Sequence, residues 1–205
     1  MTVVDPHLQL DDGVDGGAQL EQILPGLGAL IAQVGPAEMR LATPCEGWTT
    51  RDLLNHVIGG AEMFAASFAG APLRDISGRL SDVVGDDPST AFGRAVDQFG
   101  AAVQEPGAME QVLALPVGSM TGQTFLRFAA FDLLIHSWDL ATTLDAPLDL
   151  PDELVAEVDH FAHVVLDPWT RDRINFQEPA TAQREATAIE RLVAFTGRSP
   201  AGIQP

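Results

Sequence analysis

The chain has 205 residues, 46% hydrophobic and 20% charged, so it is long enough for one domain with a full core and ordinary in composition for a soluble globular protein. Its 29 acidic residues outnumber 11 basic ones, all arginine, and give a net charge of −18. Such a surface repels phosphate backbones and anionic lipids, which excludes nucleic acid and membranes as expected partners. Cys45 is the single cysteine, which excludes an internal disulfide.

The N-terminal segment is polar and rich in aspartate and glycine. It has no basic region followed by an apolar one, as a secretion signal would, and no apolar run in the chain reaches the roughly 20 residues that span a bilayer. We therefore expect a cytoplasmic protein. Residues 1–17 are predicted to form a flexible tail, and residues 18–200 a single helical domain.

Helical periodicity begins after this tail. Apolar residues recur at helical spacing over residues 20–34, and Pro25 among them predicts a helix that is kinked or restarted. Thr49 and Asp52 form a capping pattern that predicts the start of a second helix. Residues 71–87 are rich in Gly, Asp and Ser and are expected to be a long connection.

The next elements follow the same logic. Pro88 predicts the first position of a third helix, and residues 112–117 predict one short extended piece. Ser119 or Thr121 is expected to cap a fourth helix that reaches Leu144, and its nearly continuous apolarity predicts the most buried helix of the protein.

Two further helices are predicted near the C-terminus. One begins at Pro151, and the last stops at Gly197 with Pro200 beyond it. The chain shows no internal repeat, so the pattern predicts an all-α fold built on four long helices.

The stretch FDLLIHSWDL, residues 131–140, places polar groups inside the predicted buried helix. Asp132 and His136 are four residues apart, so their side chains leave one helical face and could chelate a cation together. Asp139 extends the same stripe. The alternative is a buried Asp132–His136 hydrogen bond that satisfies both groups without a metal.

His56, on the second helix, is the candidate for a third ligand. Gly59 and Gly60 beside it weaken the helix but would leave open space for a cavity. Two histidines and one carboxylate with an open position form the catalytic type of zinc site. The alternative is that the glycines allow close helix packing and His56 is a satisfied core residue.

The remaining candidates are weaker. His160 and His163 are three residues apart on the predicted fifth helix, but no third partner is evident. Cys45 is either a nucleophile or a small apolar filler. Trp48 and Trp138 suit core packing as well as the wall of a ligand site.

Three segments of the chain together resemble a known family. TPCEGWTTRDLLNHVIGG, residues 43–60, is similar to the first metal-ligand helix of DinB-like four-helix bundles, in the actinobacterial branch that includes mycothiol-dependent maleylpyruvate isomerase. FDLLIHSWDLATTL, residues 131–144, resembles the second ligand segment of that branch, and RLVAFTGRSP, residues 191–200, resembles the ending of its short members.

This resemblance implies an up-down-down-up four-helix bundle with additional C-terminal helices. It also implies metal ligands at His56, Asp132 and His136. The isomerase has glutamate where this chain has Asp132, so the carboxylate here reaches less far. The chain is also expected to be too short for the additional C-terminal domain of the isomerase.

The resemblance further implies a divalent metal, zinc with nickel or iron as alternatives, and mycothiol as cosubstrate. Zinc favours the thiolate form of a bound thiol, so the expected reaction is S-transfer to an electrophilic small molecule, or an isomerisation. Asp139 is expected to hold a ligand imidazole in its tautomer.

Three other readings stay open. The protein could be a non-catalytic metal-binding bundle that acts in metal or stress handling. It could be a plain helical scaffold in which Asp132 and His136 pair with each other, or a nonhaem iron oxygenase, because two histidines and a carboxylate also suit ferrous iron. Pairing through a helical face would make the protein a homodimer.

Overall fold

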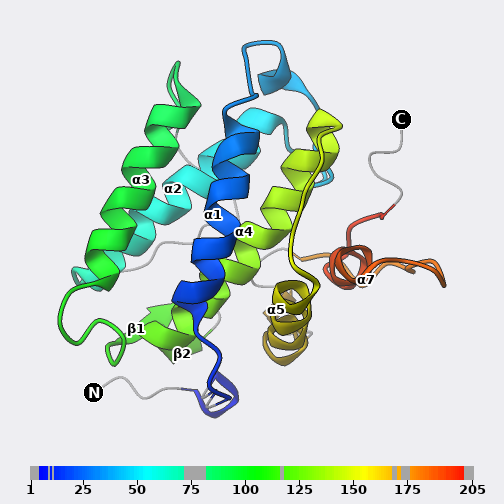
Figure 1. Cartoon of the computed structure of the whole chain (residues 1–205). Coiled ribbons are helices and arrows are strands. Elements are labelled where there is room, and N and C mark those ends of the chain that lie inside the picture. Colours follow the sequence, from blue (N-terminus) through cyan, green and yellow to red (C-terminus); the bar gives the residue numbers. More distant parts are fainter. Residues whose placement is uncertain are drawn as a thin grey trace.

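A computed structural model of the whole chain shows a helical bundle with a small β-hairpin at one end (Figure 1). The structure describes residues 5–8, 10, 12–71, 82–115, 118–167, 170–171 and 176–200. The elements in chain order are η1 (Pro6–Leu8), α1 (Gly16–Ile31), η2 (Glu38–Arg40), α2 (Thr50–Phe68), α3 (Pro88–Val103), β1 (Val112–Leu115), β2 (Gly118–Thr121), α4 (Gly122–Leu144), α5 (Asp152–Val165) and α7 (Ala188–Phe195).

The four long helices pair as α1 with α4 and α2 with α3. Helices α1 and α4 run in one direction, and α2 and α3 run in the other, so the order along the chain is up-down-down-up (Figure 1). Helix α5 packs on α4, and α7 packs on α5. The predicted all-α, DinB-like bundle with additional C-terminal helices is confirmed, with the hairpin as an addition.

Helix starts lie where local capping chemistry predicts them. Thr49 accepts a hydrogen bond from the Asp52 backbone N–H, and the Asp52 carboxylate accepts one from the Thr49 backbone N–H, which completes a capping box. Thr121, rather than Ser119, caps α4 by accepting from Thr124 N–H. Pro88 is the first residue of α3, as predicted.

Helix α1 begins earlier than the periodicity predicts. Its first residue is Gly16, capped by the Asp15 carboxylate, and a single helix runs through Pro25 instead of restarting there. Gly16 lets α1 approach α4 closely, because a Cβ at this position would lie 2.5 Å from the backbone nitrogen of Arg127. Close packing of α1 on α4 therefore accounts for a helix start at Gly16, whereas apolar periodicity alone places the start of α1 later.

Part of the segment predicted as a tail contacts the bundle. Leu8 is only 2% exposed, and the Asp5 carboxylate accepts a hydrogen bond from the Ser119 backbone N–H. Residues 1–4, 9 and 11 lie outside the described residues, so the division into a flexible tail, residues 1–17, and a domain, residues 18–200, stays a prediction.

The segment before α4 is an antiparallel hairpin rather than one extended piece. Strand β1 pairs with β2 so that Val112 faces Thr121 and Leu115 faces Gly118. The prediction of a single strand over residues 112–117 missed the second strand, and Val117 lies outside the described residues. The connection predicted over residues 71–87 also lies largely outside them, at residues 72–81.

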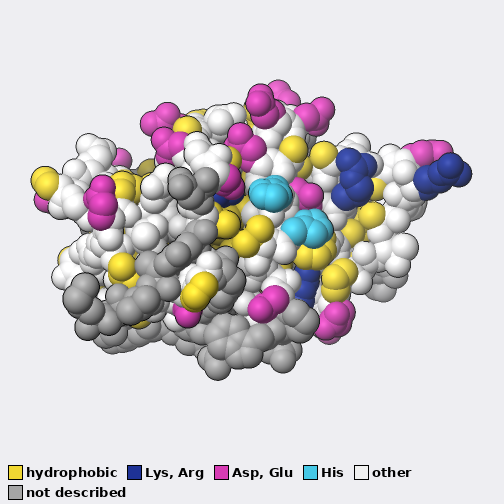
Figure 2. Space-filling view, turned by 90° about the horizontal axis from the view of Figure 1, so that it is seen from below, with side chains coloured by type: hydrophobic (Ala, Val, Ile, Leu, Met, Phe, Trp, Pro, Cys, Tyr) yellow, Lys and Arg dark blue, Asp and Glu magenta, His cyan; other side chains and the backbone are white. Residues whose placement is uncertain are grey.

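Helix α4 is the buried centre of the bundle, as its apolarity predicts. Nearly all of its residues up to Ala141 are buried. No described helix combines the length and the apolarity that a membrane crossing needs. Acidic side chains are spread over the outer surface shown in Figure 2, in keeping with the net charge of −18.

Phe125 joins α4 to the α2–α3 pair. Its ring is fully buried and meets the ring of Phe64 edge-on at 4.7 Å between centroids.

Phe125→Ala should therefore lower the free energy of unfolding by about 3–5 kcal/mol, because a cavity replaces the ring. Urea unfolding measures this change. Leu41→Ala, at a side chain that is 43% exposed, is the control and should change it by less than about 0.5 kcal/mol. Equal effects of the two variants would contradict this packing.

Candidate metal centre

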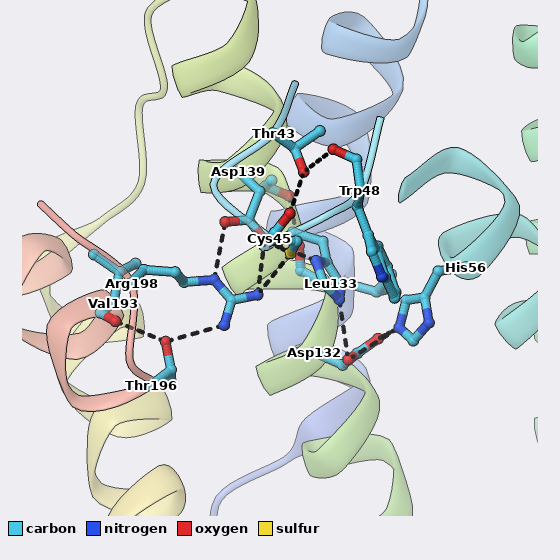
Figure 3. A network of polar contacts seen from close by, with 12 residues as sticks. Thr43, Cys45, Trp48, His56, Asp132, Leu133, Asp139, Val193, Thr196 and Arg198 are labelled. Atoms are coloured by element: carbon cyan, nitrogen blue, oxygen red, sulfur yellow. Dashed lines mark hydrogen bonds and ion pairs between the residues drawn. The ribbon is translucent and has the colours of Figure 1, made fainter. Parts of the chain in front are cut away.

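Helices α2 and α4 bring His56, Asp132 and His136 together inside the bundle. Figure 3 shows His56 and Asp132 facing each other. His56 Nε2 lies 3.4 Å from Asp132 Oδ2, and His136 Nε2 lies 3.5 Å from Asp132 Oδ1. One donor atom from each residue lies within 4.8 Å of the others. The carboxylate thus stands between two imidazoles, each presenting its Nε2.

These separations suit a shared cation better than direct pairing. A buried ionic hydrogen bond between nitrogen and oxygen is typically about 2.7–2.9 Å long. Two ligand atoms that each lie about 2.1 Å from a tetrahedral zinc ion are about 3.4 Å apart. The observed 3.4 and 3.5 Å distances match this second spacing. The three residues present fit a divalent ion.

The cluster is buried within the bundle. His56, Asp132 and His136 are 7%, 9% and 5% exposed. A Cβ on Gly60, one turn after His56, would meet no atom closer than Phe64 Cε2 at 4.0 Å. This is an ordinary van der Waals distance, so close helix packing does not require glycine at this position, and the cavity expected beside Gly59 and Gly60 stays a prediction.

A loop from α2's N-terminal side covers the cluster. Thr43 N–H donates to the Trp48 carbonyl, and Ala42 pairs with Thr49, so residues 42–49 form a short hairpin-like turn. This turn places the Trp48 indole against both imidazoles. Its ring centroid lies 5.1 Å from that of His56 and 6.2 Å from that of His136. Trp48 is thus a wall of the cluster.

Behind His136 lies a network centred on Asp139, which is fully buried. The Asp139 Oδ2 atom lies 2.9 Å from His136 Nδ1. Arg198 donates from Nε to Asp139 Oδ1 at 2.9 Å and from Nη2 to Oδ2 at 2.8 Å, which is a two-point ion pair. The Cys45 thiol donates to Oδ2 at 3.2 Å (Figure 3).

Cys45, His136 and Asp139 also offer three donor atoms within 4.8 Å. However, Arg198 Nη2 lies 3.3 Å from the Cys45 sulfur and pairs with Asp139 as well. A guanidinium is permanently charged, so a cation placed among these atoms would be repelled at close range. This second group is therefore a hydrogen-bonded network, and the Cys45 side chain is neither an apolar filler nor a metal ligand in it.

Charge within the cluster sets the protonation states. Burial alone raises the pKa of Asp132, but the charges of His136 and His56 outweigh it and hold the pKa far below its usual value. Burial alone lowers the pKa of His136, yet the Asp132 charge and hydrogen bonds with Asp132, Asp139 and Cys45 raise it well above the usual value. Without a metal, the carboxylate is ionised and His136 holds an extra proton.

The Asp139 network is charged in the same way. Burial raises the pKa of Asp139, but the guanidinium of Arg198 and the hydrogen bonds with His136 and Arg198 lower it far more. The charge of Asp139 in turn raises the pKa of Arg198 despite its burial. Asp139 is therefore an ionised acceptor whose oxygens are surrounded by donors.

Residues 20–141 match the family described as mycothiol maleylpyruvate isomerase N-terminal domain. This match covers more than half of the chain. The chain belongs to the mycothiol maleylpyruvate isomerase N-terminal domain family. It is also 31% identical to the uncharacterized proteins Rv0738 and MT0763 of Mycobacterium tuberculosis strains H37Rv and CDC 1551, over 172 residues that make up 83% of this chain and 91% of theirs. No solved structure gives a significant match.

Within this family fold, the structure gathers every residue of the predicted site: His56, Asp132, His136 and, behind them, Asp139. His160 and His163 lie on the exposed outer part of α5, where His163 stacks on Phe195. Trp138 lines a separate pocket near the start of α7. These three residues are not part of the cluster.

Sequence reasoning missed Arg198 and the polar role of Cys45. The signal available for Arg198 was its place directly after the glycine that ends the last helix, in the RLVAFTGRSP segment. Such a position marks a turn but does not name the residue that the side chain reaches. Arg198 also lies outside the residues that match the family.

The pKa of His136 leads to a pH prediction for metal-free protein. Because its folded-state pKa is raised, His136 stabilises the fold fully below about pH 6.5, and this stabilisation is lost as pH rises through the raised value. In chelator, the parent protein should lose more stability than His136→Gln between about pH 6 and pH 9. Urea unfolding at both pH values measures the difference, with His163→Gln as an exposed-histidine control. Equal pH dependence of the parent and His136→Gln would contradict this charge assignment.

Proposed function

We propose that the protein binds one divalent metal ion through His56, Asp132 and His136 and uses it with a low-molecular-weight thiol. The observation that carries the proposal is the distance of the two histidine Nε2 atoms from the Asp132 oxygens, 3.4 and 3.5 Å, which fits ligands of one ion and is long for direct ion pairs. Burial of a carboxylate with two imidazoles is also costly without a cation, and a divalent ion offsets that cost.

Zinc suits this donor set best. Two imidazoles and one carboxylate are the protein ligands of many catalytic zinc sites, which keep a fourth position for water or substrate. Nickel and iron are the alternatives, because imidazole ligands suit both. When bound, zinc would favour the thiolate form of a thiol at the open position, which is the nucleophilic form.

Family membership supports mycothiol as the thiol. The matched family is described by mycothiol and maleylpyruvate isomerisation, and the match includes all three proposed ligands. We infer an S-transferase or isomerase that acts on an electrophilic small molecule. The residues of the chain would position the thiol: Trp48 walls the cluster, and Asp139 holds the His136 imidazole from its far side.

One observation favours a second candidate, a non-catalytic metal-binding bundle in metal or stress handling. All three proposed ligands are less than 10% exposed, and the Trp48 ring covers both imidazoles. A site so enclosed suits retention of an ion. This candidate predicts metal occupancy without thiol affinity or turnover.

Single alanine substitutions test the ligands. His56→Ala, Asp132→Ala and His136→Ala should each lose bound zinc, because each removes one of three ligands, while the apolar contacts of the bundle keep the fold. Elemental analysis and calorimetric zinc titration measure the loss, and circular dichroism checks the fold. The exposed-histidine variant His163→Ala should bind zinc as the parent does. His56→Ala that still binds zinc with parental affinity would refute the three-ligand site.

A thiol titration separates the two candidates. Zinc-loaded parent protein should bind mycothiol and gain thermal stability, because a ligand that binds only the folded state raises its stability. Metal-free parent protein and zinc-treated His56→Ala should show no such gain. A zinc-loaded parent that is not stabilised by millimolar mycothiol would leave the non-catalytic bundle as the function.

A further inference from the structure

Arg198 links the C-terminal segment to the cluster from outside the region that defines the family. It is 9% exposed, and its two contacts with Asp139 come from the far end of the described chain. Asp139 in turn contacts His136. A continuous series of contacts therefore runs from Arg198 through Asp139 to His136, a proposed metal ligand. Figure 3 shows the Arg198 guanidinium against Asp139.

The end of α7 is built to deliver this side chain. Gly197 has φ +90°, a conformation that other residues rarely adopt, and a Cβ there would lie 2.5 Å from Gln177 Cβ. The Arg198 N–H donates to the Val193 carbonyl, and the Gly197 N–H donates to the Ala194 carbonyl. These two bonds form a Schellman motif, which fixes the direction of the chain after the helix.

Further contacts hold the guanidinium in place. Its Nη1 donates to the Thr196 hydroxyl at 3.3 Å, and its carbon lies 5.4 Å above the Phe176 ring. Nη2 reaches both Asp139 and the Cys45 sulfur. A lysine has no planar fork and could not make the two parallel bonds to Asp139.

The two-point pair determines what Asp139 can do. With Arg198 on both of its oxygens, Asp139 stays an acceptor in one orientation, and Oδ2 faces His136 Nδ1. Nδ1–H donates to Asp139, which leaves Nε2, on the other side of the ring toward Asp132 and His56, as the nitrogen that can exchange its proton for a metal ion. Loss of Arg198 would free Asp139 to rotate and leave its charge buried without its main partner.

We propose that Arg198 is a positioning residue, which clamps Asp139 so that the His136 imidazole presents Nε2 to the metal. The C-terminal segment after α7 is then part of the site, although it lies outside the family match. The effect on metal affinity rests on the proposed function, whereas the effect on the His136 ring does not.

The test uses Arg198→Gln and Arg198→Lys in the full-length chain, with Arg191→Gln as the matched control. Arg191 is an exposed arginine on α7, the helix that precedes Arg198, and it donates to the Ala186 carbonyl. Nitrogen-15 and proton NMR of histidine side chains in metal-free protein reads the His136 Nδ1–H resonance, assigned by its absence in His136→Gln. Zinc titration by calorimetry provides the second readout.

The hydrogen-bonded Nδ1–H resonance should be visible and downfield in the parent and in Arg191→Gln, and lost to exchange in Arg198→Gln. Zinc affinity of Arg198→Gln should fall roughly 10- to 100-fold, with a smaller fall for Arg198→Lys. An unchanged resonance in folded Arg198→Gln would overturn the proposal. If Arg198→Gln does not fold, Arg198→Lys decides: loss of the Nδ1–H resonance supports the proposal, and an unchanged resonance overturns it. If the parent protein binds no zinc, the proposed metal site is refuted. The Nδ1–H resonance would still test whether Arg198 and Asp139 orient His136.

Discussion

The structure depends on the burial of one carboxylate, Asp132, between two imidazoles in the middle of a helical bundle. Taking these groups out of water is costly, and long contacts of 3.4 and 3.5 Å recover only part of that cost. The surrounding architecture holds this cluster in place: α2 and α4 carry the three residues, and the Trp48 loop covers both imidazole rings. The divalent ion that we propose would offset the cost of this burial.

Most of the fold could be predicted because its signals are local. Each signal depends on residues that are neighbours in the sequence: the capping box at Thr49, the proline that opens α3 and the continuous apolarity of α4. The Asp132–His136 pair is local too, since i,i+4 spacing on a helix fixes their shared face. His56 belongs to another helix, so its place depends on how α2 packs on α4. Its candidacy rested on the neighbouring glycines and on the family resemblance.

What could not be predicted arises from packing between distant segments. The early start of α1 depends on its close approach to α4 at Gly16. The second strand of the hairpin lacks the alternating apolar pattern that marks a strand, with Gly118 and Ser119 in its first half. Arg198 and Cys45 reach Asp139 across 59 and 94 residues of sequence, and no local pattern reports such contacts. The ion pair between Arg198 and Asp139 is therefore evident only from the three-dimensional structure.

X-ray absorption at the zinc edge of the zinc-loaded, thiol-free protein tests the central claim most directly. The account predicts imidazole scattering from two histidines, with nitrogen and oxygen ligands at about 2.0–2.2 Å and no sulfur. Sulfur at about 2.3 Å would place the ion at Cys45 instead, and a shell without imidazole would place it outside the cluster. Either result would contradict a metal centre formed by His56, Asp132 and His136.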